Sequence, residues 1–404
     1  MKKRILFVDD EANVLQGLQR MLRGLRDCWD MQFASSGEEA LTLLDKEIYD
    51  VLVTDMRMPG MDGAQLLTEV KRRHPRMIRI VLSGQVEMET MLRSVDLTHQ
   101  FIAKPCDAEA LRSVITRSTA LHDLLENETI KQMVSSLKSL PSLPSLYLEI
   151  MQELKSENSS MARVGKIIST DIGMSAKILQ LVNSAFFGLP RQVSNPSQAA
   201  IYLGMDTIRA LVLSVNIFSQ FSDRELNDLG LRGLWKHSMI ISAAAREIAA
   251  LENCAQNVID FSLTAGLLHD VGKLVLASNL PSEYAQVLKY ATDMGINAEA
   301  AEREILSITH AEIGAYLLGL WGLQDPLVEA VCFHHYPSHA PHSAFSPLTV
   351  IHVANALYYE RKDPVAGNRN KLDPQYLEAI GKSDRLIAWR KTFSEILQRG
   401  ESND

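Results

Sequence analysis

The stretch DVLVTD, residues 50–55, is a short apolar segment rich in β-branched side chains that begins and ends with aspartate. Four similar segments accompany it along the chain, and segments with helical periodicity separate each from the next. Such alternation is typical of a parallel sheet with helices on both faces. We therefore predict a doubly wound, five-stranded parallel α/β domain over residues 1–122, with strands at ILFVD (5–9), MQFA (31–34), DVLVTD (50–55), RIVLS (79–83) and QFIAK (100–104).

Acidic, hydroxyl and basic side chains stand at the ends of these predicted strands, where function gathers in parallel sheets. A strand order of 2-1-3-4-5 would bring four of these ends to one edge. Three close carboxylates need a cation, and an all-oxygen ligand set suits Mg²⁺. An aspartate activated in this way can accept a phosphoryl group, while a lysine neutralises a phosphate oxygen and a serine donates a hydrogen bond to it. The residues concerned are Asp9, Asp10, Asp55, Ser83 and Lys104.

Four motifs, FVDDE, VTDMRMPGMDG, LSG and FIAKP, occur in this order at predicted strand ends. They resemble the motifs of response-regulator receiver domains over essentially all of residues 1–122. The resemblance implies that Asp55 is the phosphoacceptor and that a cognate histidine kinase is the partner. It also implies that Asp9, Asp10 and Asp55 bind Mg²⁺ together with the backbone carbonyl of Arg57.

The same resemblance implies roles for residues on the last two predicted strands. Ser83 and Lys104 would take part in phosphoryl transfer. Phe101 matches the aromatic switch position, which moves inward when Ser83 engages the phosphoryl group. Pro105 would follow Lys104 in a cis peptide bond.

Residues 107–140 contain neither proline nor glycine and fit a helix that continues past the receiver domain. We predict a helical linker over residues 123–140. Its interrupted apolar pattern fits an amphipathic linker or, alternatively, a seam between two copies in a homodimer. SLPSLPSLY then ends the helix and marks a boundary, because the residue before each proline is held away from helical angles.

Beyond this boundary the periodicity is helical, and we predict an all-α domain over residues 141–363. DIGMSAKILQLVNSAFFG (171–188) and NPSQAAIYLGMDTIRALVL (195–213) follow the paired prolines. Together they resemble the opening of an HDOD domain, the helical output module related to HD phosphohydrolases. An HD-like half would begin near residue 230. A loop and a last amphipathic helix, at about 375–398, would complete residues 364–404.

A series of histidines with one aspartate runs through the HD-like half. A single histidine on an apolar helix is more often a hydrogen-bonded core residue than a ligand. Neutral imidazoles with a bridging carboxylate, however, suit two closely spaced transition-metal ions that could activate water toward a phosphodiester. The order of these residues also resembles the HD superfamily and its cyclic-dinucleotide phosphodiesterase branch. The candidate site comprises His237, His269, Asp270, His310, His334 and His335.

Two features oppose an active site of that kind. The phosphodiesterase branch has a final aspartate roughly twenty residues beyond the double histidine, where this chain has Asn355; an amide offers only one neutral oxygen to a divalent ion. The branch's Gly-Tyr-Pro loop is also missing from HHYPSHAPHSA. Lys273, one turn from His269 and Asp270, either contacts a substrate phosphate or pairs with Asp270, and we favour the pairing.

The composition excludes further classes of function. The net charge is −8, and residues 1–122 contain 17 Lys/Arg against 18 Asp/Glu, so clustered cations for a nucleic acid or an anionic membrane are missing. The four cysteines form no CxxC pair, which argues against a disulfide framework or a zinc ribbon. No signal peptide or membrane span is indicated. We expect a cytoplasmic protein.

The sequence thus predicts a two-component response regulator. Phosphorylation of Asp55 would control a non-catalytic HDOD domain that binds a partner protein or a nucleotide-type regulatory ligand. The alternative is a phosphorylation-gated, metal-dependent HD-type phosphohydrolase or cyclic-dinucleotide phosphodiesterase.

Overall fold

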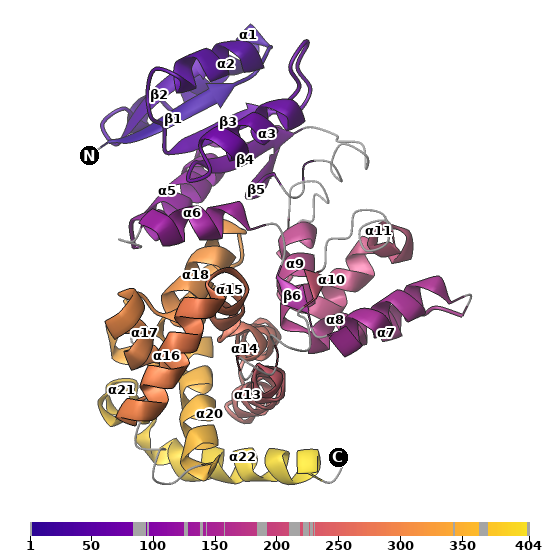
Figure 1. The fold of residues 1–404 in the computed structure, drawn as a ribbon, viewed down its shortest axis with the longest axis vertical. Helices are drawn as coiled ribbons and strands as arrows, with labels where there is room; N and C mark the ends of the chain where they lie inside the picture. Colours follow the sequence, from indigo (N-terminus) through magenta and orange to yellow (C-terminus); the bar gives the residue numbers. More distant parts are fainter. Residues whose placement is uncertain are drawn as a thin grey trace. The chain divides into compact units, whose positions relative to one another are not determined.

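The computed structural model describes residues 2–83, 94, 97–124, 128–137, 140–142, 144–156, 158–183, 192–209, 219–220, 226, 229, 231–341, 344–362 and 371–401. Contacts divide the chain into two compact units (Figure 1). The first, called the receiver unit below, comprises Met1–Ser139, Gln180–Gln192 and Gly319–Gly322. The second, called the helical unit, comprises the remaining residues.

The receiver unit contains the predicted parallel sheet, in the order β2-β1-β3-β4-β5. The central strands are buried on both faces, as expected for a sheet covered by helices on both sides. Leu6, Val8 and Leu52 pack against helices α2 and α3, while Ile5 and Phe7 on the opposite face are fully buried. The strands are β1 (Lys3–Val8), β2 (Trp29–Ala34), β3 (Val51–Asp55), β4 (Ile78–Ser83) and β5 (Gln100–Ala103).

Helices alternate with these strands, and local signals fix where some of them begin. Asp62 and Gln65 form a capping box at the start of α3, in which each side chain accepts a hydrogen bond from the other residue's backbone. Ser36 caps α2 by accepting from the backbone N–H of Glu39. The helices are α1 (Ala12–Met21), α2 (Gly37–Leu44), α3 (Gly63–Arg73), α5 (Ala108–Leu124) and α6 (Glu128–Ser136).

Helix α6 is attached to the receiver sheet through a buried arginine. Arg79, in β4, is 1% exposed, and its guanidinium donates to the carbonyls of Leu97 at 2.6 Å and Ser135 at 2.7 Å. His99 also lies within hydrogen-bond distance of the Ser135 carbonyl. Because Ser135 lies in the last turn of α6, the guanidinium supplies a positive charge where the helix dipole favours one.

The helical unit consists of packed helices, as predicted, with one small addition. Pro141–Ser142 and Ser219–Gln220 form a parallel two-stranded pair, β6 and β7. The first part contains α7 (Pro144–Lys155), α8 (Met161–Thr170), α9 (Ile172–Val182), α10 (Pro196–Leu203) and α11 (Met205–Arg209). Most of the NSAFFG motif and residues 210–218 of the second motif segment lie outside the described residues.

The second part of the helical unit contains the helices that carry the histidine series. Helix α13 packs against α14, α20 and α22. None of the described helices is long and apolar enough to cross a bilayer. The helices are α13 (Arg232–Leu251), α14 (Gln256–Leu268), α15 (Val271–Asn279), α16 (Pro281–Met294), α17 (Ala298–Leu306), α18 (His310–Leu320), α19 (Asp325–Phe333) and α20 (Pro347–Lys362).

The last helix differs from the prediction of a single helix at about 375–398. The structure has α21 (Pro374–Ala379), a turn, and α22 (Leu386–Glu401). Gly381 in the turn has a φ of +67°. Glycine adopts this left-handed conformation at little cost, and it commonly ends a helix there. Glu252, whose side chain is 5% exposed, then holds α22, because its carboxylate accepts from Lys382 and Arg385, each at 2.7 Å, and from the Trp389 indole at 3.0 Å.

Helices α15 and α18 approach each other at one glycine. A Cβ added to Gly272 would lie 1.9 Å from the carbonyl oxygen of His310. We expect Gly272→Ala to lower the free energy of unfolding by about 3 kcal/mol, because the two helices must separate. Urea unfolding of the full chain, followed by helical circular dichroism, measures this change.

The matched control is Gly233→Ala in α13, where an added Cβ meets no atom within 4 Å. This variant should leave stability unchanged or raise it by up to about 1 kcal/mol, because alanine restricts the unfolded chain. Equal stabilities of the two variants would contradict the close approach of α15 and α18.

Candidate functional site

The carboxyl edge of the receiver sheet brings two predicted acids and a lysine together. Asp9 follows β1, Asp55 ends β3 and Lys104 follows β5. The Lys104 ammonium donates to Asp9 Oδ2 at 2.7 Å and to Asp55 Oδ1. Burial lowers the pKa of Lys104, but the hydrogen bonds to Asp55 and Asp9 outweigh burial and hold the pKa above its ordinary value. The lysine therefore stays charged between the two carboxylates.

Asp55 is accessible and positioned by the backbone. Its side chain is 13% exposed, whereas that of Asp9 is 2% exposed. The backbone N–H of Arg57 donates to Asp55 Oδ2 at 2.7 Å. One edge of this carboxylate is therefore partly open to solvent, while its contacts keep it in place.

The three carboxylates predicted to bind Mg²⁺ do not all lie close together. Among the described residues, Asp9, Asp10 and Asp55 form no group of three whose ligand oxygens all lie within 4.8 Å of one another. Asp10 is exposed, and Lys104 occupies the space between Asp9 and Asp55. The oxygen donors present at this edge nevertheless fit a hard cation such as Mg²⁺.

The remaining receiver predictions fall on β4, β5 and the residue after Lys104. Ser83 ends β4, but its side chain lies outside what the structure describes, as does Gly84 of the LSG motif. Phe101 lies opposite Val81 in the sheet and is partly buried against the core. The peptide bond between Lys104 and Pro105 is cis, as the resemblance implied.

In the helical unit, the predicted histidines and aspartate converge from helix ends. His269 follows α14, Asp270 precedes α15 and His310 begins α18. Helix α19 ends at Phe333, so His334 and His335 lie beyond the regular helix, with ring centroids 4.1 Å apart. We call the six residues the histidine centre: His237 on α13, His269, Asp270, His310, His334 and His335.

Asp270 lies in the middle of the histidine centre and is 1% exposed. Its Oδ2 faces the Nε2 atoms of His237 and His269, at 3.6 and 3.4 Å. Its Oδ1 faces the Nε2 atoms of His310 and His334, at 3.1 and 3.8 Å. Imidazole nitrogens therefore surround one carboxylate on two sides.

The second ring nitrogen of three histidines is engaged away from the centre. Nδ1 of His269 lies 2.8 Å from the Gly266 carbonyl, and Nδ1 of His334 lies 2.8 Å from the Val331 carbonyl. Nδ1 of His310 lies 2.7 Å from Glu302 Oε2. An acceptor beside Nδ1 assigns the proton to that atom and leaves the Nε2 lone pair free for a ligand bond.

The electrostatics of the centre favour neutral imidazoles at most positions. Burial, followed by the charge of neighbouring histidines, lowers the pKa of His237, His334 and His335 well below the ordinary value. His310 differs, because the carboxylates of Glu302 and Asp270 outweigh burial and raise its pKa to about 9. Neutral imidazole is the form that binds a metal, and metal binding at His310 would release a proton.

Several polar atoms in the centre are buried without a hydrogen bond among the described residues. They include His334 Nε2 in the centre and Asn355 Oδ1 beside it. Buried polar atoms rarely stay unpaired, and those that do call for an unseen ion or water. The donor set therefore fits a divalent transition metal.

Lys273 lies beside Asp270, and Asn355 lies near the double histidine. The Lys273 ammonium is 2.7 Å from Asp270 Oδ2, the pairing that we favoured over a substrate contact. Asn355 is 4% exposed on α20 and shares a cavity wall with His334 and His335. The amide of Asn355 thus lies beside the double histidine.

Two residues of this region were missed from the sequence. Glu302 on α17 is fully buried and accepts from both the backbone N–H and Nδ1 of His310. His352 on α20 lies between the carbonyl of His334 and the backbone N–H of Asp373, at 2.9 and 2.8 Å. Glu302 is eight residues from its partner and gave no spacing signal. His352 lies in the segment LTVIHVANALYY, where only Asn355 matches a position of the HD pattern.

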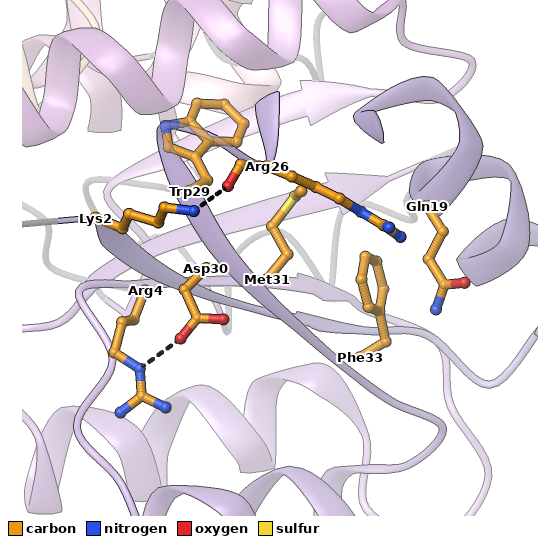
Figure 2. Close-up of a pocket in the computed structure, with 8 residues that line it drawn as sticks. All are labelled: Lys2, Arg4, Gln19, Arg26, Trp29, Asp30, Met31 and Phe33. Carbon is orange, nitrogen blue, oxygen red and sulfur yellow. Dashed lines mark hydrogen bonds and ion pairs between the residues drawn. The ribbon is translucent and has the colours of Figure 1, made fainter. Parts of the chain in front are cut away.

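Of two hollows in the structure, one adjoins the histidine centre and the other lies apart from both candidate sites. A cavity of about 400 Å³ is lined by His334, His335 and Asn355 and so opens the histidine centre to solvent. A larger hollow, about 590 Å³, lies along β2 of the receiver unit (Figure 2). There Arg4 pairs with Asp30, and its lining contains no histidine and no nucleophile of the sheet edge. The smaller cavity is the one adjoining reactive groups.

Comparisons with known proteins agree with both halves of this description. The family model of the response regulator receiver domain matches residues 5–116, and that of the HDOD domain matches residues 140–337. The second match ends before α20, so Asn355 lies beyond it.

An uncharacterised protein of Treponema pallidum is 26% identical over 280 residues, which is 67% of this chain and 52% of that protein. The hydrogenase transcriptional regulatory protein HoxA of Cupriavidus necator is 36% identical over 107 residues, 25% of this chain and 21% of HoxA. The chain thus spans about half the length of the first relative and a fifth of the second.

The crystal structure of the MmoQ response regulator of Methylococcus capsulatus is 22% identical, covers 63% of this chain and 98% of that one, and has a TM-score of 0.47. The two family matches lie in the same order as the sheet and the helices described above. The chain therefore belongs to the response regulators, with an N-terminal receiver domain followed by an HDOD domain.

Proposed function

We propose that Asp55 accepts a phosphoryl group from a cognate histidine kinase and that this step controls a non-catalytic output of the HDOD domain. The output would be the binding of a partner protein or a nucleotide-type regulatory ligand. One observation carries the proposal: a partly exposed carboxylate at the end of β3 lies against a charged lysine at the carboxyl edge of the sheet. That edge is where ligands bind in open α/β folds.

The proposed transfer needs a nucleophile, charge neutralisation and a leaving group. An Asp55 oxygen attacks the phosphorus of a phosphohistidine, an O–P bond forms, and the P–N bond to the kinase histidine breaks. Lys104 neutralises a phosphoryl oxygen. Mg²⁺, held by Asp9, Asp10, Asp55 and the carbonyl of Arg57, would supply the remaining positive charge.

The consequence of phosphorylation is an electrostatic change at the sheet edge. We propose that Ser83 and Phe101 respond to it as a switch and bias the state of the output domain. We further propose a cytoplasmic location, no nucleic-acid partner, and domain boundaries at residues 122, 140 and 363. A homodimer seam along residues 107–140 is the alternative to a plain linker.

Asp55→Asn should abolish labelling by a small phosphodonor such as acetyl phosphate, because an amide cannot form the acyl phosphate. Phosphate-affinity electrophoresis of the full chain measures the labelled fraction, which should fall at least a hundredfold. Asp50→Asn is the matched control, because Asp50 precedes the same strand at its opposite end and accepts from the backbone N–H of Arg4. Labelling that survives in Asp55→Asn would refute the assignment.

A second candidate is a phosphorylation-gated, metal-dependent HD-type phosphohydrolase. The observation in its favour is the convergence of all six residues of the histidine centre beside a cavity. A divalent metal there would activate a water for attack on phosphorus. Asn355 opposes this candidate, because a neutral amide neither balances a second ion nor acts as an anionic ligand.

The non-catalytic proposal predicts that the full chain, loaded with Mn²⁺ or Fe²⁺, leaves cyclic di-GMP unhydrolysed with or without acetyl phosphate. Chromatography of the nucleotide after incubation measures turnover. The double variant His269→Ala/Asp270→Ala sets the background. Turnover by the wild type that this variant abolishes would establish the second candidate instead.

Asn355→Asp restores the carboxylate of the HD pattern and tests whether Asn355 limits metal binding. A buried aspartate without a cation destabilises the fold, whereas a bound divalent ion compensates it. The thermal shift on adding Mn²⁺ should therefore be larger in Asn355→Asp than in the wild type. An unchanged shift would show that Asn355 lies outside the reach of the metal.

A further inference from the structure

The two halves of the histidine centre differ in the charge that they already hold. His237, His269 and Asp270 form one group of three potential ligands, and His310, His334 and His335 form the other. In the first group, the Lys273 ammonium lies 2.7 Å from Asp270 Oδ2, and its side chain is only 14% exposed. A partly buried cation therefore already pairs with the oxygen that would bind a metal in this half, and a divalent ion beside it would meet like-charge repulsion.

The second group consists of imidazole nitrogens alone. The Nε2 atoms of His310 and His335 are 3.2 Å apart, and the ligand atoms of all three histidines lie within 4.8 Å of one another. His334 Nε2 is buried and makes no hydrogen bond in the described part of the chain. Two nitrogens at such a distance repel each other unless a proton or a cation lies between them. Three nitrogen ligands suit a borderline transition metal better than Mg²⁺.

Glu302 holds this second group in a ligand geometry. One carboxylate oxygen, Oε2, accepts from both the backbone N–H and the Nδ1–H of His310, each at 2.7 Å. This pair of bonds fixes the ring orientation and directs Nε2 into the centre. A carboxylate behind a histidine in this way increases the basicity of a metal-binding imidazole.

The cavity gives the same group an open side. His334 and His335 line the space of about 400 Å³, and Lys371 lies on its wall. Asp373 also lines it, but its carboxylate accepts from Ser338 Oγ and from the backbone N–H of Tyr376. A metal held by three histidines keeps a coordination position for an outside ligand. With Lys371 nearby, an oxyanion such as phosphate or a carboxylate fits that position.

We infer that the histidine centre holds one divalent transition-metal ion, bound by His310, His334 and His335 and positioned by Glu302, with an exchangeable site for an oxyanion facing the cavity. The His237–His269–Asp270 group binds Lys273 in place of a second metal. This inference rests on the metal binding considered for the second candidate function, but it does not need turnover. It makes the HDOD domain a metal-dependent ligand sensor.

Co²⁺ titration of the chelator-treated full chain tests this inference. Equilibrium dialysis should give one Co²⁺ per chain, with a visible d–d spectrum that changes when inorganic phosphate is added. His335→Gln should weaken binding at least tenfold, whereas His237→Gln, in the other group, should retain one Co²⁺ with the wild-type spectrum. Circular dichroism of each variant confirms folding.

Glu302→Gln keeps the size of the side chain and removes its charge, and it should weaken Co²⁺ binding about 10–100-fold. Glu299→Gln is the matched control on the same helix, because Glu299 is also buried but pairs with Arg303 and Tyr336 rather than with a ligand histidine. This control should bind Co²⁺ as the wild type does.

The outcomes separate this inference from the proposed functions. Two Co²⁺ per chain, or binding lost in His237→Gln and kept in His335→Gln, would overturn the three-histidine assignment. Equal affinities of Glu302→Gln and wild type would overturn the role of Glu302. The absence of Co²⁺ binding by the wild type would overturn the inference and the second candidate together, while the Asp55 proposal would stand.

Discussion

A buried carboxylate, Asp270, is the constraint on which the helical unit depends. Its side chain is 2% exposed, so its charge must be balanced within the protein. Two cationic groups, Lys273 on α15 and His310 on α18, balance this charge. The neutral imidazoles of His237 on α13 and His334 after α19 lie 3.6 and 3.8 Å from the carboxylate. Helix ends that are distant in sequence therefore have to meet around one residue. Gly272, two residues later, allows the backbone of α18 to come close enough.

The two units use the same pairing of lysine with aspartate in different settings. In the receiver unit, Lys104 bridges Asp9 and Asp55, and its side chain is 24% exposed. Lys104 could leave one carboxylate when a phosphoryl group or Mg²⁺ binds there, because water can solvate the separated charges. In the helical unit, the side chains of Lys273 and Asp270 are 14% and 2% exposed, so separating them would leave a buried carboxylate without its cation. The first pair suits a switch, and the second suits a permanent structural role.

Much of the fold follows from local pattern. The predicted strand DVLVTD contains the observed strand β3, and the rule that function gathers at the carboxyl ends of parallel strands brought Asp9, Asp55 and Lys104 together correctly. The same rule did not reveal that Asp10 is exposed, because backbone register does not determine which of two adjacent acids turns inward. Helical periodicity likewise continued across Gly381, since the apolar residues on either side keep the spacing of one helix.

The burial of two charged residues, Glu302 and Arg79, could not be predicted from the sequence, for one physical reason. Glu302 and Arg79 are charged, and a charged side chain in an amphipathic segment is normally solvated. Each is instead buried through partners from another element: His310 for Glu302, and the Ser135 carbonyl for Arg79. No spacing within one segment encodes such a pairing. The histidine series was visible because five histidines and one aspartate recur in order along the sequence. A single carboxylate such as Glu302 gives no such pattern.

Under the one-metal inference, Asn355 accounts for the histidine centre holding one divalent ion rather than two. When a metal keeps the ligand imidazoles neutral, the charges of Asp270, Glu302 and Lys273 sum to −1 at the centre. One divalent ion would bring that net charge to +1, whereas two ions would bring it to +3. An aspartate at position 355 would have compensated one of these positive charges. Under the one-metal inference, the amide removes that compensation without changing the size of the side chain, so the centre would keep its packing around His334 and His335 and bind one ion rather than two.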